Sequence, residues 1–352
     1  MKMILFPIFG FLFFNLVFLQ AKVSAQEQKT SSVNWITFEK VKEFKKSKPK
    51  PILIFFYKAD EDTSNLMLNT TLVDKDICAY INNKFYAVKF DASSEEAVNF
   101  LDDKIYKKDP LKKDHDLITL LLGAKPIIPT VMIYNDKAIG FAFNGYKNQY
   151  DMICALIYIA ENVEKNTRYE IWAPAYFKTY PPGKSNNQTA LGIHWLSLKE
   201  ALRLNNEKPK KIFLTWYTKW NASSSVVLFN ALNQPKVVEY MNQNFYCVRL
   251  DAQTADTLVW DKTFVNKNES HHYHDMALAM MKGKMQFPSY FYFDATKKLI
   301  LNKQFYLSPE EFFMLSNYVG SESYKTIKLA DYLKNFRIEL NSASPTQSTN
   351  LK

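Results

Sequence analysis

The spacing of the cysteines along this sequence decides whether they can carry out thiol–disulfide exchange. The 352 residues include three cysteines, Cys78, Cys154 and Cys247, and no two of them form a C-x-x-C pair. Thiol–disulfide exchange needs a reactive thiolate, commonly at a helix N-terminus, and a second thiol close by. Cys154 and Cys247 instead lie within apolar segments, where we expect buried and unreactive thiols.

The histidines suggest a second chemistry. His271, His272 and His274 fall within four residues and precede Asp275, and imidazole with carboxylate suits zinc or copper. Adjacent side chains diverge, and only His274 has a counterpart in the other half of the chain, His115. We therefore expect a structural His-Asp pair that begins a helix, in which the Asp caps and the His packs. A metal site at His271, His272 and His274 is the alternative.

Two further chemistries find little support. A Ser-His-Asp hydrolase using Ser223 or Ser224 with His274 would need a nucleophile elbow, and the sequence contains none. Phosphate-binding loops need glycine for the close approach of backbone amides. The chain has only 8 glycines and no nucleotide-binding motif, so we expect no cofactor.

The chain repeats itself at an offset of 160 residues. Residues 35–92 align without a gap with residues 195–252, and 16 of the 58 aligned positions are identical. At an offset of 159, His115 then matches His274 and Pro129 matches Pro288. A period of this length indicates two whole domains rather than a solenoid.

Both halves predict the same order of elements from their hydrophobic patterns. The first half reads as helix 36–47, strand 51–57, turn 58–64, helix 64–82, strands 85–91, 130–134 and 138–143, and helix 150–161. The second reads as helix 196–206, strand 211–217, turn 218–224, helix 225–243, strands 245–251, 289–293 and 298–305, and helix 308–319. We predict domains at 33–170 and 193–340, a Pro- and Asn-rich linker at 171–192, and a disordered tail at 341–352.

Three segments in each half resemble the thioredoxin superfamily. They are the strand–turn–helix segments FFYKADEDTSNLM and LTWYTKWNASSSVVL, the strands FYAVKFDA and FYCVRLDA, and the tripeptides Ile128-Pro129-Thr130 and Phe287-Pro288-Ser289. The likeness is to extracytoplasmic bacterial members. It implies an α/β fold with two tandem thioredoxin-like domains, each a mixed sheet flanked by helices. It also implies cis prolines at Pro129 and Pro288.

The resemblance also places the two cysteine positions of that family. They fall on Asn221 and Ser224 in the second half and on Glu61 and Ser64 in the first, so neither pair contains sulfur. All four residue types suit a helix start, and we expect them to cap helices. The resemblance therefore implies a protein without catalytic cysteines. An oxidoreductase family member that acts with a redox partner is the alternative.

The same resemblance implies a shallow groove for extended polypeptide beside the turn and the proline. Its predicted residues are Trp220, Met285 and Phe287 in the second half and Ile128 in the first. We expect a non-enzymatic protein that binds a protein or peptide partner through this groove, as a scaffold, assembly or holdase-like factor.

The N-terminus predicts export. Lys2 precedes an apolar run at residues 4–19, and Val23-Ser24-Ala25 fits a cleavage site, so residues 1–25 are a predicted signal peptide. We expect a periplasmic or outer-envelope protein with no membrane span after cleavage. The net charge of +10 comes from scattered lysines, which is typical of solvated surfaces, and we expect no nucleic-acid partner.

Overall fold

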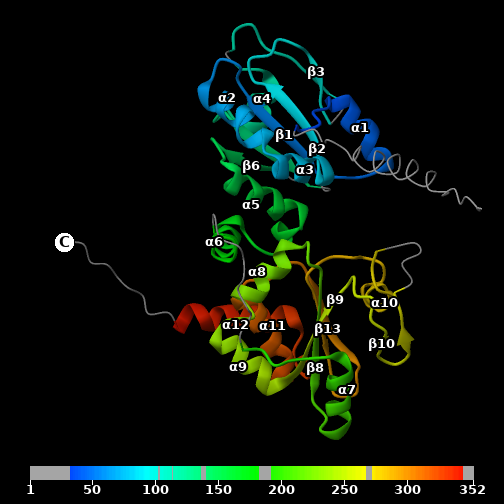
Figure 1. Cartoon of the computed structure of the whole chain (residues 1–352). Coiled ribbons are helices and arrows are strands. Elements are labelled where there is room, and N and C mark those ends of the chain that lie inside the picture. Colours follow the sequence, from blue (N-terminus) through cyan, green and yellow to red (C-terminus); the bar gives the residue numbers. More distant parts are fainter. Residues whose placement is uncertain are drawn as a thin grey trace, which may run out of the picture.

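The computed structural model describes residues 32–101, 104–112, 114–135, 140–181, 192–266 and 272–343. The predicted signal peptide, His271 and residues 344–352 lie outside these ranges. Figure 1 shows two α/β halves, which we call the first and second repeats, with helices α5 (Gln149–Ala160) and α6 (Tyr169–Thr179) between the two sheets.

The first repeat is built on a mixed four-stranded sheet with the order β2-β1-β5-β6. Strands β1 and β2 are parallel, whereas β5 runs antiparallel to both β1 and β6. Its elements before α5 are α1 (Phe38–Ser47), β1 (Ile52–Tyr57), α2 (Asp62–Asn69), η1 (Thr71–Val73), α3 (Lys75–Lys84), β2 (Tyr86–Asp91), β3 (Val98–Asn99), β4 (Ile105–Tyr106), α4 (Asp116–Leu122), β5 (Thr130–Tyr134) and β6 (Gly140–Asn144). The 3-10 turn η2 (Val163–Lys165) separates α5 from α6.

The second repeat has the same sheet with one additional edge strand, in the order β13-β12-β8-β9-β7. Its elements are β7 (Trp195–Leu196), α7 (Leu198–Glu207), β8 (Lys211–Tyr217), α8 (Ala222–Asn230), α9 (Pro235–Asn244), β9 (Phe245–Asp251), β10 (Leu258–Val259), β11 (Thr263–Phe264), α10 (Asp275–Met281), β12 (Ser289–Phe293), β13 (Leu299–Gln304), α11 (Pro309–Gly320), η3 (Ser323–Lys325) and α12 (Leu329–Ala343). A parallel pair joined through helices and closed by an antiparallel hairpin is the thioredoxin arrangement. The predicted fold class is confirmed.

Alternation along the central strand explains why helices cover both faces of the sheet. Ile52, Ile54 and Phe56 pack with buried residues of α1 and α4, whereas Leu53 and Phe55 pack with residues of α2, α3 and α5. Successive side chains of a strand point to opposite faces, so a continuous apolar run produces a sheet that is buried on both sides.

The two long helices predicted after the turns are each broken in the structure. Residues 64–82 divide into α2, η1 and α3. Asp74 ends η1 and caps α3 by accepting hydrogen bonds from the amides of Asp76 and Ile77. Residues 225–243 divide into α8 and α9, and Pro235 is the first residue of α9. Proline lacks an amide hydrogen and disfavours helix in the residue before it, so it begins a new helix.

The predicted linker 171–192 differs from the structure over its first half, which forms most of α6. Trp172 and Tyr176 lie one helical turn apart and are both buried, and this burial stabilises the helix although Pro174 lies within it. Helix α6 corresponds to α12 of the second repeat, since Tyr169 and Leu329 are 160 residues apart. The first repeat therefore extends to Thr179, beyond the predicted limit at 170, and the predicted tail at 341 begins inside α12.

One buried apolar cluster includes residues of both repeats. Leu53 of β1 and Trp172 of α6 belong to the same cluster as Phe213 of β8 and Phe312 of α11. The helices between the two sheets therefore form a shared core. Among the described residues, no helix is long and apolar enough to span a bilayer.

Candidate functional site

In the first repeat, the turn between β1 and α2 holds Glu61 and Ser64. Glu61 is the N-cap of α2, and its carboxylate accepts hydrogen bonds from the amides of Thr63 (3.2 Å) and Ser64 (2.6 Å). Partial desolvation opposes these bonds, but the hydrogen bonds from Ser64 and Thr63 prevail and lower the pKa of Glu61. Ser64 is buried, and its Oγ accepts a hydrogen bond from the Lys58 amide.

In the corresponding turn of the second repeat, between β8 and α8, the residues at the helix start are buried. Asn221 is the N-cap of α8, and its side-chain oxygen accepts hydrogen bonds from the amide (2.8 Å) and the hydroxyl (2.6 Å) of Ser224. The exposed fractions are 3% for Asn221 and 9% for Ser224. Asn221 and Glu61 cap their helices as the sequence predicts, whereas Ser224 and Ser64 do not: each donates its amide to the cap residue.

A carboxylate from the first repeat completes this helix start. Glu161, which directly follows α5, accepts hydrogen bonds from the amides of Ala222 (2.9 Å) and Ser223 (2.7 Å) and from the Ser223 hydroxyl (2.6 Å). Burial raises the pKa of the Glu161 carboxyl, and the three donated hydrogen bonds oppose this rise. Together with Asn221, Glu161 satisfies the first three amides of α8, which a helix otherwise leaves without partners.

Other hydrogen bonds between the repeats surround Glu161. The Asn162 side chain donates to the Gln286 side chain (3.2 Å), and Asn166 donates to the carbonyl oxygen of Gln304 (3.0 Å). At the other end of α8, Asn230 donates to the Thr179 hydroxyl (2.7 Å). The turn that would carry the cysteines of the second repeat is therefore part of the boundary between the repeats.

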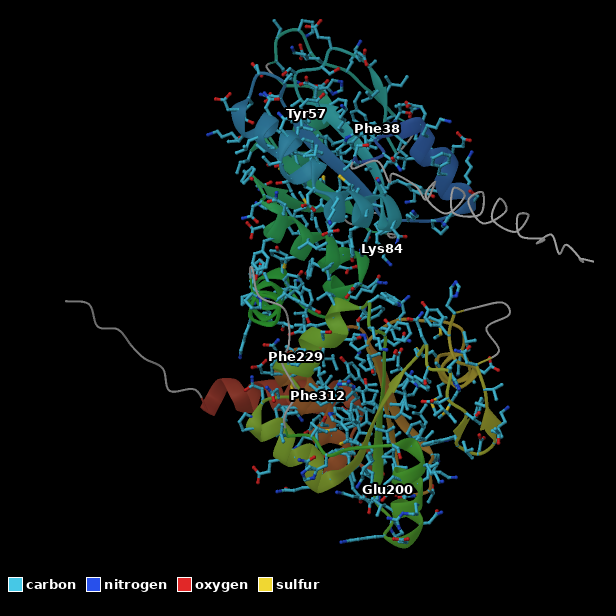
Figure 2. All side chains as sticks on the ribbon, in the orientation of Figure 1. Phe38, Tyr57, Lys84, Glu200, Phe229 and Phe312 are labelled. Carbon is cyan, nitrogen blue, oxygen red and sulfur yellow. The ribbon has the colours of Figure 1, made fainter. Side chains whose placement is uncertain are left out.

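The predicted groove residues of the second repeat lie beside this boundary. Trp220 and Phe287 are in edge-to-face contact, with ring centroids 6.0 Å apart. The Lys84 ammonium, from the end of α3 in the first repeat, lies 5.0 Å from the centroid of the Trp220 ring. Figure 2 shows Lys84 on the side of the first repeat that faces the second. Phe287 is buried and Met285 half-buried in one apolar cluster, whereas 48% of Trp220 is exposed.

The first repeat presents its equivalent surface more openly. Both the Ile128-Pro129 and the Phe287-Pro288 peptide bonds are cis. Ile128 is half-buried, and within the described part of the chain neither its N–H nor its C=O takes part in a hydrogen bond. Its neighbour Ile127 is 55% exposed, and Leu66 of α2 is 48% exposed.

The two matched histidines are helix caps, and here the structure corrects the role assigned to the neighbouring aspartate. Nδ1 of His274 accepts from the Met276 amide (3.1 Å), and its Nε2 donates to the Asp256 carbonyl oxygen (2.9 Å). His115 makes the same two bonds, to the Leu117 amide and the Glu96 carbonyl oxygen. In each case the histidine, rather than the following aspartate, is the N-cap.

This arrangement uses both ring nitrogens of His274, because an amide can only donate and a carbonyl oxygen can only accept. His272 is exposed. Among the residues that the structure describes, no group of three or more His, Cys, Asp or Glu side chains is placed to hold a metal.

The three cysteines are buried and unpaired. Burial raises the pKa of Cys154 and of Cys247 to about 12, and it also raises the pKa of Cys78. A thiol with a raised pKa forms little of the nucleophilic thiolate at neutral pH.

Sequence reasoning did not single out Glu161. One local signal was present: Glu161 is an acidic residue at the C-terminal end of an apolar helix, where the helix dipole disfavours a negative charge. Such a placement indicates a partner elsewhere in the fold. The sequence gives no sign that this partner is the start of α8.

Comparison with known proteins adds no closer assignment. No protein-family model matches the chain, and no curated protein matches it. Similar solved structures include a thioredoxin-fold protein from Helicobacter pylori, which is 15% identical over 38% of this chain and 86% of that chain (TM-score 0.31). A putative disulphide-isomerase from Bacteroides thetaiotaomicron is 18% identical over 38% and 98% (TM-score 0.27). The reduced C-terminal domain of DsbD from Neisseria meningitidis is 20% identical over 34% and 91% (TM-score 0.25).

Proposed function

We propose that this chain, whose two halves have the thioredoxin fold, is an exported, redox-inactive protein that binds a protein partner through its first repeat. The second repeat serves as the support that holds the first. The role is that of a scaffold or assembly factor in the cell envelope, and the ligand is an extended segment of another polypeptide.

The side chains at the cysteine positions of the family support the proposed lack of thiol chemistry. In the second repeat the buried Asn221 accepts from the amide of Ser224, and in the first Glu61 accepts from the amide of Ser64. A thiolate at the start of α8 would share that position with the Glu161 carboxylate. Two negative charges at one helix N-terminus repel each other, so this site disfavours a reactive thiolate.

The observation that carries the proposal is the asymmetry between two equivalent surfaces. In the second repeat, Glu161 occupies the helix start and Asn162 contacts Gln286, the residue that corresponds to Ile127. In the first repeat, Ile127 and Leu66 are exposed. A groove that is covered within the chain is not available to another protein, whereas an open one is.

The first-repeat surface, defined by Leu66, Ile127 and Ile128, has the parts needed to hold an extended peptide. Within the described residues the N–H and C=O of Ile128 form no hydrogen bond, so each can pair with a backbone group of the peptide. The exposed side chains of Leu66 and Ile127 can supply apolar contacts. We expect a partner segment with an apolar side chain next to its paired residue.

Site-specific photo-crosslinking in intact cells tests this proposal. A photo-reactive residue is placed at position 127, and a control is placed at Val259, which is 54% exposed in the short strand β10 of the second repeat. We expect one dominant crosslinked protein from position 127 that is absent from position 259. Equal capture at the two positions, or none at 127, would overturn the proposal.

A second arm tests the geometry of the surface. With the photo-reactive residue at position 66, Ile127→Asp should abolish the crosslinked product. Binding of an apolar partner segment would bury the new carboxylate without a partner, which costs free energy. Val259→Asp is the matched control and should leave the product unchanged. Capture from position 220 alone would instead indicate the second repeat as the binding surface.

A further inference from the structure

The second repeat contains a pocket of about 340 Å³ between α8 and the sheet, a volume at the small end of ligand-binding pockets. Thr215 and Tyr217 of β8, Arg249 of β9 and Pro288 form its sheet side. Val227, Leu228, Phe229 and Leu232 contribute apolar side chains along α8 and just beyond it. Phe229, labelled in Figure 2, belongs to this lining.

The internal repeat shows why the pocket exists here. The first repeat has Phe55, Met67 and Val131 at the positions of Thr215, Val227 and Tyr290, and all three are buried. Phe55 stacks on Tyr57, with ring centroids 5.8 Å apart. Thr215 and Val227 are smaller than Phe55 and Met67 and leave room on the α8 side of this layer, although Tyr290 is larger than Val131.

Two polar atoms of the lining residues are left without partners. Among the described residues, neither the Thr218 hydroxyl nor the Tyr290 hydroxyl has a hydrogen-bond partner. Only 1% of Thr218 and none of Tyr290 is exposed. Buried hydroxyls are normally hydrogen-bonded, because leaving one unpaired costs free energy. Both oxygens have essentially no accessible surface, however, so they offer no contact to a ligand in the pocket.

Arg249 supplies a charge at the same place. Its guanidinium lies 4.6 Å from the centroid of the Tyr217 ring and 6.0 Å from that of Trp195. Within the described ranges, no carboxylate forms an ion pair with it. Lys219 is exposed and also lines the pocket. Its ammonium lies 3.9 Å from the carboxylate of Asp251. The half-buried Arg249 is thus a cation without a carboxylate partner, within the described ranges, beside a pocket that has an apolar side along α8.

We infer that this pocket binds the carboxylate of a small molecule or chain end with an apolar body. Arg249 pairs with the carboxylate, because a guanidinium matches a carboxylate in a bidentate hydrogen bond. The lining residues of α8 cover the apolar part. The source is either a free organic acid or the C-terminus of a peptide that ends in an apolar residue. This site is separate from the first-repeat surface.

Calorimetric titration of the mature chain with 3-phenylpropionate tests the inference, and 3-phenylpropionamide is the uncharged match. We expect the acid to bind at least about tenfold more tightly than the amide, since the charged group contributes a charge-assisted hydrogen bond. Equal affinity for the two, or no heat from the acid at millimolar concentration, would overturn the inference. Tighter binding of N-acetyl-Ala-Phe than of 3-phenylpropionate would identify a peptide C-terminus as the source, and weaker binding a free acid.

Three variants locate the site. Arg249→Met should weaken binding of the acid by about tenfold or more, whereas Lys89→Met removes the charge at the equivalent position of the first repeat and should change nothing. Thr215→Phe restores the residue of the first repeat and should abolish binding by filling the pocket. Thermal melting checks that each variant is folded. An unchanged affinity in folded Arg249→Met and folded Thr215→Phe contradicts the assignment.

Discussion

At the scale of single residues, His115 and His274 perform one structural task in the two repeats. Each accepts the amide two residues ahead through Nδ1 and donates to a distant carbonyl oxygen through Nε2. Both are fully buried. Burial lowers the pKa of both imidazoles, and the pattern of donors and acceptors requires the neutral ring.

This requirement predicts a pH dependence of stability. Because the folded-state pKa is below the unfolded value of about 6.5, the unfolded chain binds more protons than the folded one as the pH falls from 7.5 to 5.5. The free energy of unfolding should therefore fall over this range, which urea denaturation would measure. His274→Asn keeps a capping oxygen but loses the Nε2 bond. It should cost about 1 kcal/mol at pH 7.5 and make the pH dependence shallower.

His194 provides the control for that series, because it is exposed. His194→Asn should retain the full pH dependence of the parent chain. If His274→Asn also retained the full pH dependence, the neutral histidine caps would not be the source of that dependence.

At the scale of elements, the two strand–turn–helix segments differ in what surrounds them. The turn before α2 is capped by its own Glu61, which is half-buried. The turn before α8 is capped by Asn221 together with Glu161 from the other repeat. The same local structure is therefore partly open to solvent in one repeat and covered in the other.

A thiol placed at each turn would report this difference. In Glu61→Cys the new thiol is partly accessible at a helix N-terminus. In Asn221→Cys it is covered and lies beside the Glu161 carboxylate, which disfavours the thiolate. We expect iodoacetamide to react with Glu61→Cys at least roughly tenfold faster than with Asn221→Cys, as measured by mass spectrometry of the folded proteins.

The parent chain supplies the background rate for this experiment, since its three cysteines are buried. Adding Glu161→Ala to Asn221→Cys should accelerate the reaction, because it removes both the cover and the nearby negative charge. Equal rates for the two single variants would show that the second turn is as open as the first.

At the scale of the whole molecule, the repeats are joined by a polar contact and an aromatic one. Glu161 binds the start of α8, and Trp172 of α6 packs edge-to-face on Tyr306 of the second repeat at 5.2 Å between ring centroids. Trp172 is completely buried. A core shared in this way couples the unfolding of the two repeats.

We therefore expect scanning calorimetry of the chain to give one cooperative transition. Glu161→Ala leaves three buried donors without an acceptor and should cost about 3 kcal/mol, and Trp172→Ala should cost about 3–5 kcal/mol through the cavity it leaves. Either variant should separate the transition into two.

The matched control is Glu207→Ala, which removes an exposed ion pair with Arg203 on α7. It should cost no more than about 0.5 kcal/mol and leave a single transition. Two separate transitions in the unmodified chain would contradict the shared core.

Much of each repeat could be predicted from local sequence. The apolar run from Ile52 to Tyr57 predicts a strand that is buried on both faces, and Asn221 predicts a helix start, because both features depend on neighbours in the chain. The lack of sulfur at the two turns also follows from the sequence alone. The linker prediction differs from the structure because Pro174 and the nearby polar residues indicate a loop. Trp172 and Tyr176 form part of the core in helix α6, and Trp172 does so in contact with Tyr306 of the second repeat.

The sequence by itself determined two thioredoxin-like repeats with helix caps where cysteines would stand, since periodicity, capping residues and the repeat offset are written along the chain. Only the tertiary structure decided which turn is covered and which surface is open. The Glu161 carboxylate meets the amides of Ala222 and Ser223 across about sixty residues of chain, and the pocket at Arg249 depends on a threonine facing a helix. Contacts of this range have no sequence period, because they are set by how two folded surfaces fit together.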